Sequence, residues 1–352
     1  MNKLRYEKQI KLKGFGLAAQ ELLQNSKILI IGAGGLGTPC AQYLNGAGVG
    51  TIGLIDDDII SLSNLPRQTL FNENEVGLLK VEVLLNKLKL QNPDTNFICH
   101  NEFLIPENAL SIIRNYDLVI DASDNFGTRY LVNDSCVILN KPFIYGAVYE
   151  FEGQVSVLNY LDGPTYRCLF AENDEPDTSL NCDDNGILGV LPALIGTYQA
   201  IEAIKIITGI GGVLSGQLLI IDTLSQSHFK IAVLLKPENK NIDVLKSFYS
   251  TPTCTNAVQL IAVDALNIWL IKDKTIQLID VRTADEFKMN SLPGAKNIPL
   301  ADFESRKREI DFSMPVVTIC ATGNRSKQAA LLLVKAGNIG EVFSLKGGLS
   351  SL

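Results

Sequence analysis

A glycine-rich segment carries the most specific chemical signal near the start of the chain. Gly32, Gly34, Gly35 and Gly37 follow the apolar run at 27–31, and a threonine-proline pair opens the next expected helix. Glycines permit a tight turn after a strand, and the free amides at the start of a helix can receive phosphate. The spacing therefore predicts a nucleotide site, with an ordinary glycine-rich strand–helix turn as the alternative.

Asp56 strengthens the prediction of a nucleotide site. It lies 24 residues after Gly32 and directly follows a second apolar run at 51–55. A carboxylate at the end of the second strand can accept hydrogen bonds from ribose hydroxyls. Taken alone, these residues are also typical of a nicotinamide-dependent dehydrogenase, so they indicate a nucleotide without saying which one.

Polar residues farther along favour chemistry at phosphorus over hydride transfer. Attack on an α-phosphorus needs cations that neutralise phosphate charge and a carboxylate that holds Mg²⁺, whereas hydride transfer needs neither. Beyond Asp56, the candidates are the amides Asn64 and Gln68 and the cations Arg67 and Lys80. After the strand at 117–121, they are the carboxylate Asp124 and the amide Asn125. Solvated surface is the alternative for Arg67 and Lys80, and a strand-end cap is the alternative role for Asp121.

A cysteine loop near the end of the sequence is the second candidate centre. It joins an expected strand at 316–319 to a helix at 327–335 and consists of Cys320, Ala321, Thr322, Gly323, Asn324, Arg325 and Ser326. Backbone amides, the start of the helix and Arg325 would favour a thiolate and stabilise a persulfide anion. The alternative is a buried structural cysteine that ends a strand.

Alternating strands and helices must position both centres. Short β-branched runs separated by amphipathic segments predict an α/β fold with a doubly wound, Rossmann-like mixed sheet. The alternation breaks into polar residues and proline after 236 and restarts near 257. We therefore expect an ATP-binding domain at 1–240, a linker at 241–256 and a smaller α/β domain at 257–352.

Composition excludes some classes of protein. The 352 residues carry a net charge of −7 and 7% aromatic residues, which is unfavourable for nucleic-acid binding. The most apolar stretch, 186–201, contains Pro192 and is expected to be too short and too interrupted to span a membrane. Seven scattered cysteines and a polar start indicate a cytoplasmic protein with reduced thiols.

Residues 4–235 resemble the MoeB/ThiF family, bacterial relatives of the ubiquitin-activating enzymes. The resemblance rests on Arg5-Tyr6-x-x-Gln9, the glycine loop, Leu54-Ile55-Asp56, Ser63-Asn64-Leu65-x-Arg67-Gln68 and Asp124-Asn125. It implies adenylation of the C-terminal glycine of a ubiquitin-like sulfur carrier of the MoaD or ThiS type, ending in Gly-Gly, and a homodimer. At matching positions, Gly35 and Asp56 would bind ATP. Its ribose and phosphates would be held by Asn64, Arg67 and Lys80, and Mg²⁺ would be held by Asp124.

Three positions relate to this family pattern in different ways. Lys8 replaces an arginine that in the family reaches the ATP of a neighbouring subunit, and it keeps the charge without the bidentate fork. Cys168 is what remains of the two Cys-x-x-Cys pairs that commonly bind zinc, so we expect no structural zinc. Cys182 matches the cysteine that can form a covalent link to the carrier.

Residues 258–352 resemble the rhodanese family. This resemblance rests on the cysteine loop, Asp280-Val281-Arg282-x-x-x-Glu286-Phe287, Leu292-Pro293-Gly294-Ala295-x-Asn297-Ile298-Pro299 and Leu345-x-Gly347-Gly348. Asp280 and Arg282 are expected to be a buried pair that fixes the loop. Joined in one chain, the two halves imply that a Cys320 persulfide attacks the carrier adenylate and that Cys182 then forms a disulfide and releases a thiocarboxylate.

Several questions stay open at this point. The resemblances leave open molybdopterin or thiamine biosynthesis as the pathway, and a cysteine desulfurase or thiosulfate as the sulfur donor. A non-catalytic scaffold that retains both folds is the main alternative function, because of Lys8, the missing zinc ligands and the short C-terminus. An NAD-dependent oxidoreductase is the weaker one, since nothing supplies a base that handles hydride transfer.

Overall fold

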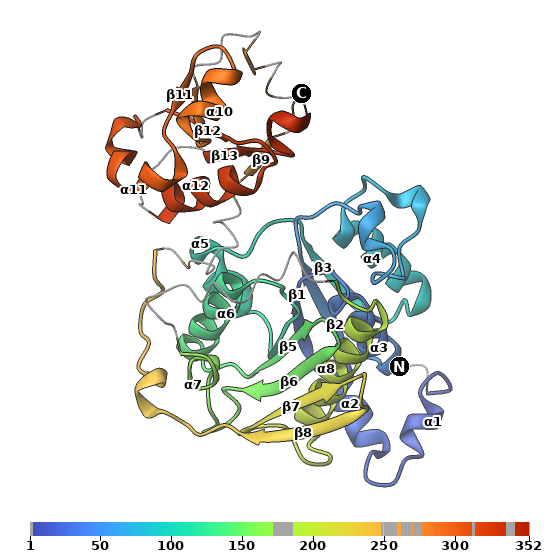
Figure 1. The fold of residues 1–352 in the computed structure, drawn as a ribbon. Helices are drawn as coiled ribbons and strands as arrows, with labels where there is room; N and C mark the ends of the chain where they lie inside the picture. Colours follow the sequence, from blue (N-terminus) through green and yellow to red (C-terminus); the bar gives the residue numbers. More distant parts are fainter. Residues whose placement is uncertain are drawn as a thin grey trace. The chain divides into compact units, whose positions relative to one another are not determined.

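The protein consists of two compact units, Met1–Pro252 and Thr253–Leu352, each with its own β-sheet (Figure 1). The computed structural model describes residues 3–171, 186–247, 249, 259–261, 263, 266, 269–270, 276–311, 314–335 and 342–351.

An eight-stranded sheet with the order β3-β2-β1-β4-β5-β6-β7-β8 forms the centre of the first unit. Its strands are β1 (Lys27–Ile31), β2 (Thr51–Ile55), β3 (Asn96–His100), β4 (Leu118–Asp121), β5 (Phe143–Tyr149), β6 (Glu152–Leu158), β7 (Gln217–Asp222) and β8 (Ser227–Ala232). Strands β1 to β5 pair in parallel, and β5 to β8 pair antiparallel. The predicted doubly wound mixed sheet is confirmed.

Helices cover both faces of this sheet. One face carries α2 (Gly16–Asn25), α3 (Gly37–Ala47), α4 (Lys80–Gln91) and α8 (Val190–Thr208), and the other carries α5 (Pro106–Ile113), α6 (Phe126–Ile138) and the short α7 (Tyr166–Leu169). β1 faces both cores, because Ile28 and Ile30 pack in one and Leu29 and Ile31 in the other. Apolar residues on both faces are typical of a parallel strand covered on each side.

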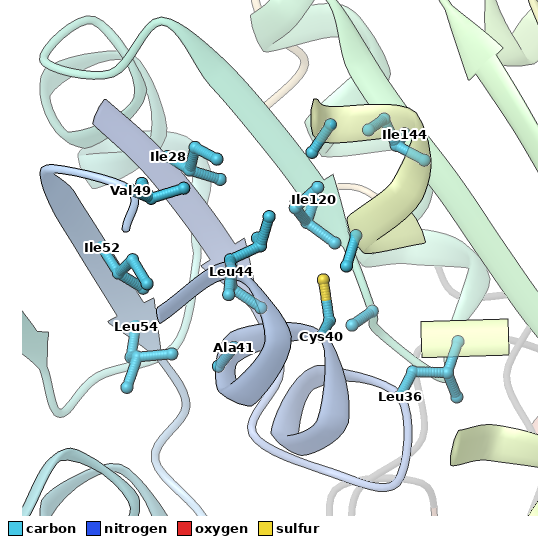
Figure 2. Packing of buried hydrophobic residues seen from close by; sticks show 14 of the residues in the cluster. Ile28, Leu36, Cys40, Ala41, Leu44, Val49, Ile52, Leu54, Ile120 and Ile144 are labelled. Atoms are coloured by element: carbon cyan, nitrogen blue, oxygen red, sulfur yellow. The ribbon is translucent and has the colours of Figure 1, made fainter. Parts of the chain in front are cut away.

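The buried side of α3 fixes the helix that follows the glycine loop. Figure 2 shows Cys40 and Leu44 of α3 among Ile28, Ile52 and Ile120 of the strands. Burial raises the pKa of the Cys40 thiol, so this cysteine packs as a small apolar side chain. The helix start, and with it the glycine loop, is therefore held rigidly against the sheet.

The apolar stretch at 186–201 was expected to be short and interrupted, but it is part of a longer continuous helix. Its helix, α8, runs unbroken to Thr208, and Pro192 lies in the first turn, where a missing N–H is tolerated. By length and composition alone, α8 is the one helix among the described residues that could cross a membrane. In this fold it packs against α3 and β5, and its buried Glu202 accepts a hydrogen bond from the Leu214 amide at 2.9 Å.

The second unit contains a parallel sheet with the order β11-β10-β12-β13-β9. Its strands are β9 (Gln259–Ile261), β10 (Gln277–Asp280), β11 (Ala295–Asn297), β12 (Val316–Ile319) and β13 (Val342–Leu345), and its helices include α10 (Ala284–Met289), α11 (Phe303–Arg306) and α12 (Asn324–Lys335). Val316 packs on one face of the sheet and Val317 on the other. This is the smaller α/β fold that the sequence predicts.

The segment after β8 packs on the first unit. Tyr249 is buried, and its hydroxyl donates a hydrogen bond to Asp134 Oδ2 at 2.8 Å. Asp134 also forms an ion pair with Arg167 at 2.7 Å, and Leu245 packs against the same core. The first part of the predicted linker at 241–256 therefore belongs to the first unit, which ends at Pro252.

Candidate active sites

The glycine loop lies where the winding of the first sheet reverses. β1 has β2 on one side and β4 on the other, and the helices that follow β1 and β4, α3 and α6, cover opposite faces. The loops after β1 and β4 therefore separate at the C-terminal edge of the sheet, where α/β proteins bind ligands. Gly32 has a φ of +98°, and a Cβ on Gly37 would lie 1.8 Å from the carbonyl oxygen of Gly32. Glycine is required at both positions.

Asp56 is fixed between β2 and the glycine loop. One carboxylate oxygen accepts a hydrogen bond from the Ala33 amide at 2.6 Å, and the other accepts one from the Asp58 amide at 2.8 Å. Burial raises the pKa of Asp56, and these two amide hydrogen bonds act in the opposite direction. Each carboxylate oxygen has a further lone pair that can accept a hydroxyl of a ribose.

The segment after Asp56 brings polar side chains to the glycine loop. The carbonyl oxygen of Arg67 would lie 3.1 Å from a Cβ on Gly35, and the buried Gln68 side chain lies beside Gly34. The Arg67 guanidinium donates a hydrogen bond to the carbonyl of Ser63 at 2.8 Å.

Asn64 and Lys80 frame this segment at its two ends. Asn64 Oδ1 accepts a hydrogen bond from the Ser61 amide at 3.2 Å and so fixes the short turn before Arg67. Lys80 begins α4, is buried, and forms an ion pair with the exposed Asp58 at 2.7 Å. The ammonium group would have to exchange this carboxylate for a phosphate in order to bind ATP.

Asp124 and Asn125 lie in the turn between β4 and α6. Asn125 caps α6, with its Oδ1 accepting a hydrogen bond from the Thr128 amide at 2.9 Å, whereas the Asp124 side chain is exposed. The buried Asp121 stabilises this turn, because its Oδ1 accepts hydrogen bonds from the amide and the hydroxyl of Ser123. Asp121 therefore has the capping role that the sequence offered as the alternative to metal binding.

Two buried side chains that sequence reasoning missed hold the same turn. Gln199 of α8 donates to the carbonyl of Asp121 at 2.7 Å, and Arg129 of α6 donates to the carbonyl of Ser123 at 3.2 Å. Both were visible in the sequence as polar residues within otherwise buried helix faces. Together they fix the backbone that presents Asp124.

The donor atoms of this region suit magnesium. Mg²⁺ prefers carboxylate oxygens and water, and Asp124 offers an exposed carboxylate at the edge of the sheet. Asp121 Oδ2, behind the turn, is buried and has no hydrogen-bond partner among the described residues. Asp56, Asp57 and Asp58 form the one group of three or more carboxylates, thiols or imidazoles, among the described residues, whose ligand atoms lie close enough to share one metal ion.

Lys8 lies apart from the other predicted site residues of its own chain. It belongs to α1 (Glu7–Ile10), and its neighbour Gln9 donates a hydrogen bond to the carbonyl of Ala47, at the end of α3. The glycine loop is at the opposite end of α3, and a helix of 11 residues is about 16 Å long. Cys182 lies outside the described residues.

Cys168 is held by hydrogen bonds where the family pattern would place a zinc ligand. Its Sγ accepts from the Lys236 amide at 3.4 Å and from the Asn239 side chain at 3.6 Å, and it lies 3.4 Å from the Thr165 hydroxyl. Burial raises the pKa of Cys168, but these hydrogen bonds outweigh it and leave the pKa below its usual value. Among the described residues, the hydrogen-bonding groups around this sulfur are the Thr165 hydroxyl, the Asn239 side chain and the backbone of Lys236.

The Cys320 loop forms a cradle for a sulfur anion. Cys320 directly follows β12, and its Sγ accepts a hydrogen bond from the Gly323 amide at 3.1 Å and lies 3.4 Å from the Ser326 hydroxyl. Burial raises the pKa of Cys320, but the Ser326 hydroxyl and the amides of Ser326, Thr322 and Gly323 outweigh it. The pKa therefore lies below that of an ordinary thiol, as required for a nucleophilic cysteine.

The second unit has two arginine–carboxylate ion pairs near the start of α10. Asp280 and Arg282 are both buried and lie 2.7 Å apart, which confirms the predicted buried pair, and Arg282 also donates hydrogen bonds to Asn290, just after α10. Arg325, expected to add positive potential to the loop, donates two hydrogen bonds to Glu286 of α10, at 2.8 and 2.7 Å. Glu286 thus compensates the Arg325 charge, and sequence reasoning missed this role although Glu286 was part of the quoted pattern.

Comparison with known proteins assigns both units. Residues 6–244 match the model of the ThiF family, and residues 266–352 match that of the rhodanese-like domain. The chain belongs to the ThiF family. Its relatives include the adenylyltransferase and sulfurtransferase MOCS3 of Aedes aegypti, 39% identical over 92% of this chain and 80% of the relative. The probable molybdopterin-synthase adenylyltransferase of Porphyra purpurea is 42% identical over 99% of this chain and 92% of its own length.

Solved structures confirm the fold of this ThiF-family chain. E. coli MccB in complex with ATP aligns with a TM-score of 0.59 and 22% identity over 66% of this chain and 72% of MccB. The MccB complex with MccA-N7isoASN aligns with a TM-score of 0.60 and 21% identity over 67% and 73% of the two chains. At these identities the likeness concerns the fold alone.

Proposed function

We propose that the protein adenylates the C-terminal glycine of a ubiquitin-like sulfur carrier and then replaces the adenylate by sulfur. The observation that carries this proposal is the presence, in one ThiF-family chain, of a glycine-loop site and a hydrogen-bonded Cys320 thiol on a rhodanese-like domain. Relatives named adenylyltransferase and sulfurtransferase MOCS3 align over most of both chains. The name molybdopterin-synthase adenylyltransferase favours a carrier of the MoaD type and molybdopterin biosynthesis over thiamine biosynthesis.

The first half-reaction takes place at the C-terminal edge of the large sheet. The carrier carboxylate attacks the α-phosphorus of ATP, the new oxygen–phosphorus bond forms, and pyrophosphate leaves with the electron pair of the broken bond. Asp56 holds the ribose, and Arg67 and Lys80 neutralise phosphate charge. Asp124, on its rigid turn, is the residue that would hold Mg²⁺, which when bound supplies further charge neutralisation.

The second half-reaction uses the Cys320 cradle. The outer sulfur of a Cys320 persulfide attacks the carbonyl carbon of the adenylate, and AMP leaves, giving an acyl disulfide. A thiolate, for which we propose Cys182, then attacks Cys320 Sγ and releases the carrier thiocarboxylate, with a disulfide formed between the two cysteines. A thiol reductant restores both cysteines before the next cycle.

We also propose that the working form is a homodimer in the cytoplasm. Lys8 lies on the far side of α3 from its own glycine loop, so its charge is available to the site of a second copy. The described cysteines, Cys40, Cys99, Cys136, Cys168 and Cys320, are all free thiols, as is usual in a reducing compartment.

Carrier-dependent exchange of labelled pyrophosphate into ATP tests the first half-reaction. We expect exchange with a MoaD-type carrier ending in Gly-Gly, and none with the same carrier lacking its last glycine. Absence of exchange with both MoaD-type and ThiS-type carriers, together with no binding of ATP, would contradict the proposal and favour a non-catalytic scaffold.

A further inference from the structure

Arg325, in the loop that follows Cys320, forms an ion pair with a glutamate. Both terminal nitrogens of Arg325 donate to Glu286, one to each carboxylate oxygen, at 2.8 and 2.7 Å. The side chains of both residues are about one-third exposed, so the pair lies at the mouth of the loop and not in the core. Arg325 also interacts electrostatically with Cys320, which places its charge within reach of the reacting sulfur.

Glu286 is held in place independently of Arg325. It occupies the third position of α10, where its carboxylate accepts hydrogen bonds from the amide and the hydroxyl of Thr283, both at 3.0 Å. This arrangement is a capping box, which fixes the side chain at the start of its helix. The carboxylate is therefore a permanent part of the loop surroundings, and its ion pair with Arg325 keeps it ionised, with a pKa of about 2.

The charges at the loop affect two kinds of sulfur donor differently. With Cys320 as a thiolate, the charges of Cys320, Arg325 and Glu286 sum to −1, since the Asp280–Arg282 pair is neutral. Thiosulfate is a dianion, so it meets net repulsion and an arginine whose bidentate hydrogen-bonding edge is occupied. A persulfide on a cysteine carries at most one negative charge and is positioned by the protein that bears it.

We propose that Glu286 is a specificity-determining residue that occupies Arg325, so that Cys320 takes sulfur from a persulfide borne by a partner protein and discriminates against thiosulfate. The Cys320 thiolate attacks the outer sulfur of the donor persulfide, a new sulfur–sulfur bond forms, and the donor cysteine leaves as a thiolate. With thiosulfate, the same attack would release sulfite with the electron pair of the broken bond. The inference rests on the sulfurtransferase half of the proposed function.

The test compares two donors in the full-length protein, thiosulfate and a cysteine desulfurase loaded with persulfide. The readout is the rate at which Cys320 gains one sulfur atom by mass spectrometry, as kcat/KM for each donor. Glu286→Gln removes the charge, and glutamine can still close the capping box. We expect the ratio of kcat/KM for thiosulfate to that for the desulfurase to rise about tenfold, through the KM for thiosulfate, and the rise to shrink at high salt.

Two further variants make the result specific. Glu309→Gln removes an equally paired carboxylate of the same unit, which binds Arg306 and Lys296, and should leave the donor ratio unchanged. Glu286→Gln with Arg325→Gln should return the ratio to that of the wild type, because the freed guanidinium is gone. A folded Glu286→Gln protein with an unchanged ratio would overturn this inference alone. A wild-type protein that accepts sulfur from neither donor would overturn the proposed sulfurtransferase function, and this inference with it.

Discussion

Replacing Ser326 by alanine tests the cause of the Cys320 reactivity. Cys320 Sγ donates toward the Ser326 hydroxyl at 3.4 Å, and this hydroxyl also accepts a hydrogen bond from Ser344 Oγ at 2.8 Å. The Ser326 hydroxyl donates its own proton to the carbonyl of Gly323 at 3.0 Å, and it can turn this proton to Cys320 Sγ once the thiol is ionised. Alanine removes this donor and leaves the backbone amides in place.

The expected magnitude follows from the strength of one charged hydrogen bond. Such bonds contribute about 1.5 to 3 kcal/mol, and because the Ser326 proton is shared we take the lower end. The pKa of Cys320 then moves up, toward the ordinary thiol value of 9.0. Below the pKa, the ionised fraction falls about tenfold for each unit by which the pKa rises, and about 1.4 kcal/mol corresponds to one unit, so at neutral pH the variant should hold about tenfold less thiolate.

Alkylation by iodoacetamide, followed at the Cys320 peptide by mass spectrometry, measures the thiolate fraction. At neutral pH the Ser326→Ala protein should react about tenfold more slowly, and at alkaline pH, where both thiols are ionised, the two rates should converge. Thr322→Ala is the matched control, because it keeps the backbone donor and removes only an exposed side chain. Equal rates for Ser326→Ala and wild type at neutral pH would refute the hydrogen-bonding explanation.

Three other substitutions test the adenylation unit. Asp124→Asn should lower carrier-dependent pyrophosphate exchange by about 10²-fold or more with little change in melting temperature, since the side chain is exposed; full exchange would contradict its role. Gly37→Ala should abolish ATP binding measured by calorimetry and lower the melting temperature, because its Cβ would lie 1.8 Å from a carbonyl oxygen; a stable, ATP-binding variant would contradict the loop geometry. Tyr249→Phe should lower the free energy of unfolding by about 1.5 kcal/mol in urea titrations, since Asp134 loses a buried donor; no loss would show that the segment after β8 adds nothing to the unit.

Local patterns predicted most of the architecture because the strands are short, apolar and followed by glycine or aspartate. The predicted strand at 316–319 agrees with β12 residue for residue. Apolar residues at helical spacing predict a helix over 76–90, whereas α4 begins at Lys80. The start is later because the Leu78 carbonyl accepts a hydrogen bond from the Ile60 amide and the Lys80 amide donates one to the Asp58 carbonyl. Helix periodicity cannot reveal a hydrogen bond to a distant loop.

The sequence did not predict which residues form ion pairs and hydrogen bonds with the charged and polar groups of the sites. Lys80 and Arg325 were both expected to offer free positive charge, and each is paired, with Asp58 and with Glu286. Gln199 reaches the β4 turn from a helix 78 positions away in sequence, a contact that only the fold creates. Residue types and spacing indicated the chemistry, whereas the balance of charge at each site depends on tertiary contacts.

The mass of an intact carrier measures the central claim most directly. The protein would be incubated with Mg-ATP, a cysteine desulfurase with cysteine, a thiol reductant and a MoaD-type or ThiS-type carrier, and each carrier would then be weighed by mass spectrometry. We predict that the MoaD-type carrier gains the mass difference between an oxygen and a sulfur atom, and that Cys320→Ala abolishes this gain. Full thiocarboxylate formation by Cys320→Ala without added sulfide, or a carrier that stops at the adenylate, would contradict the account.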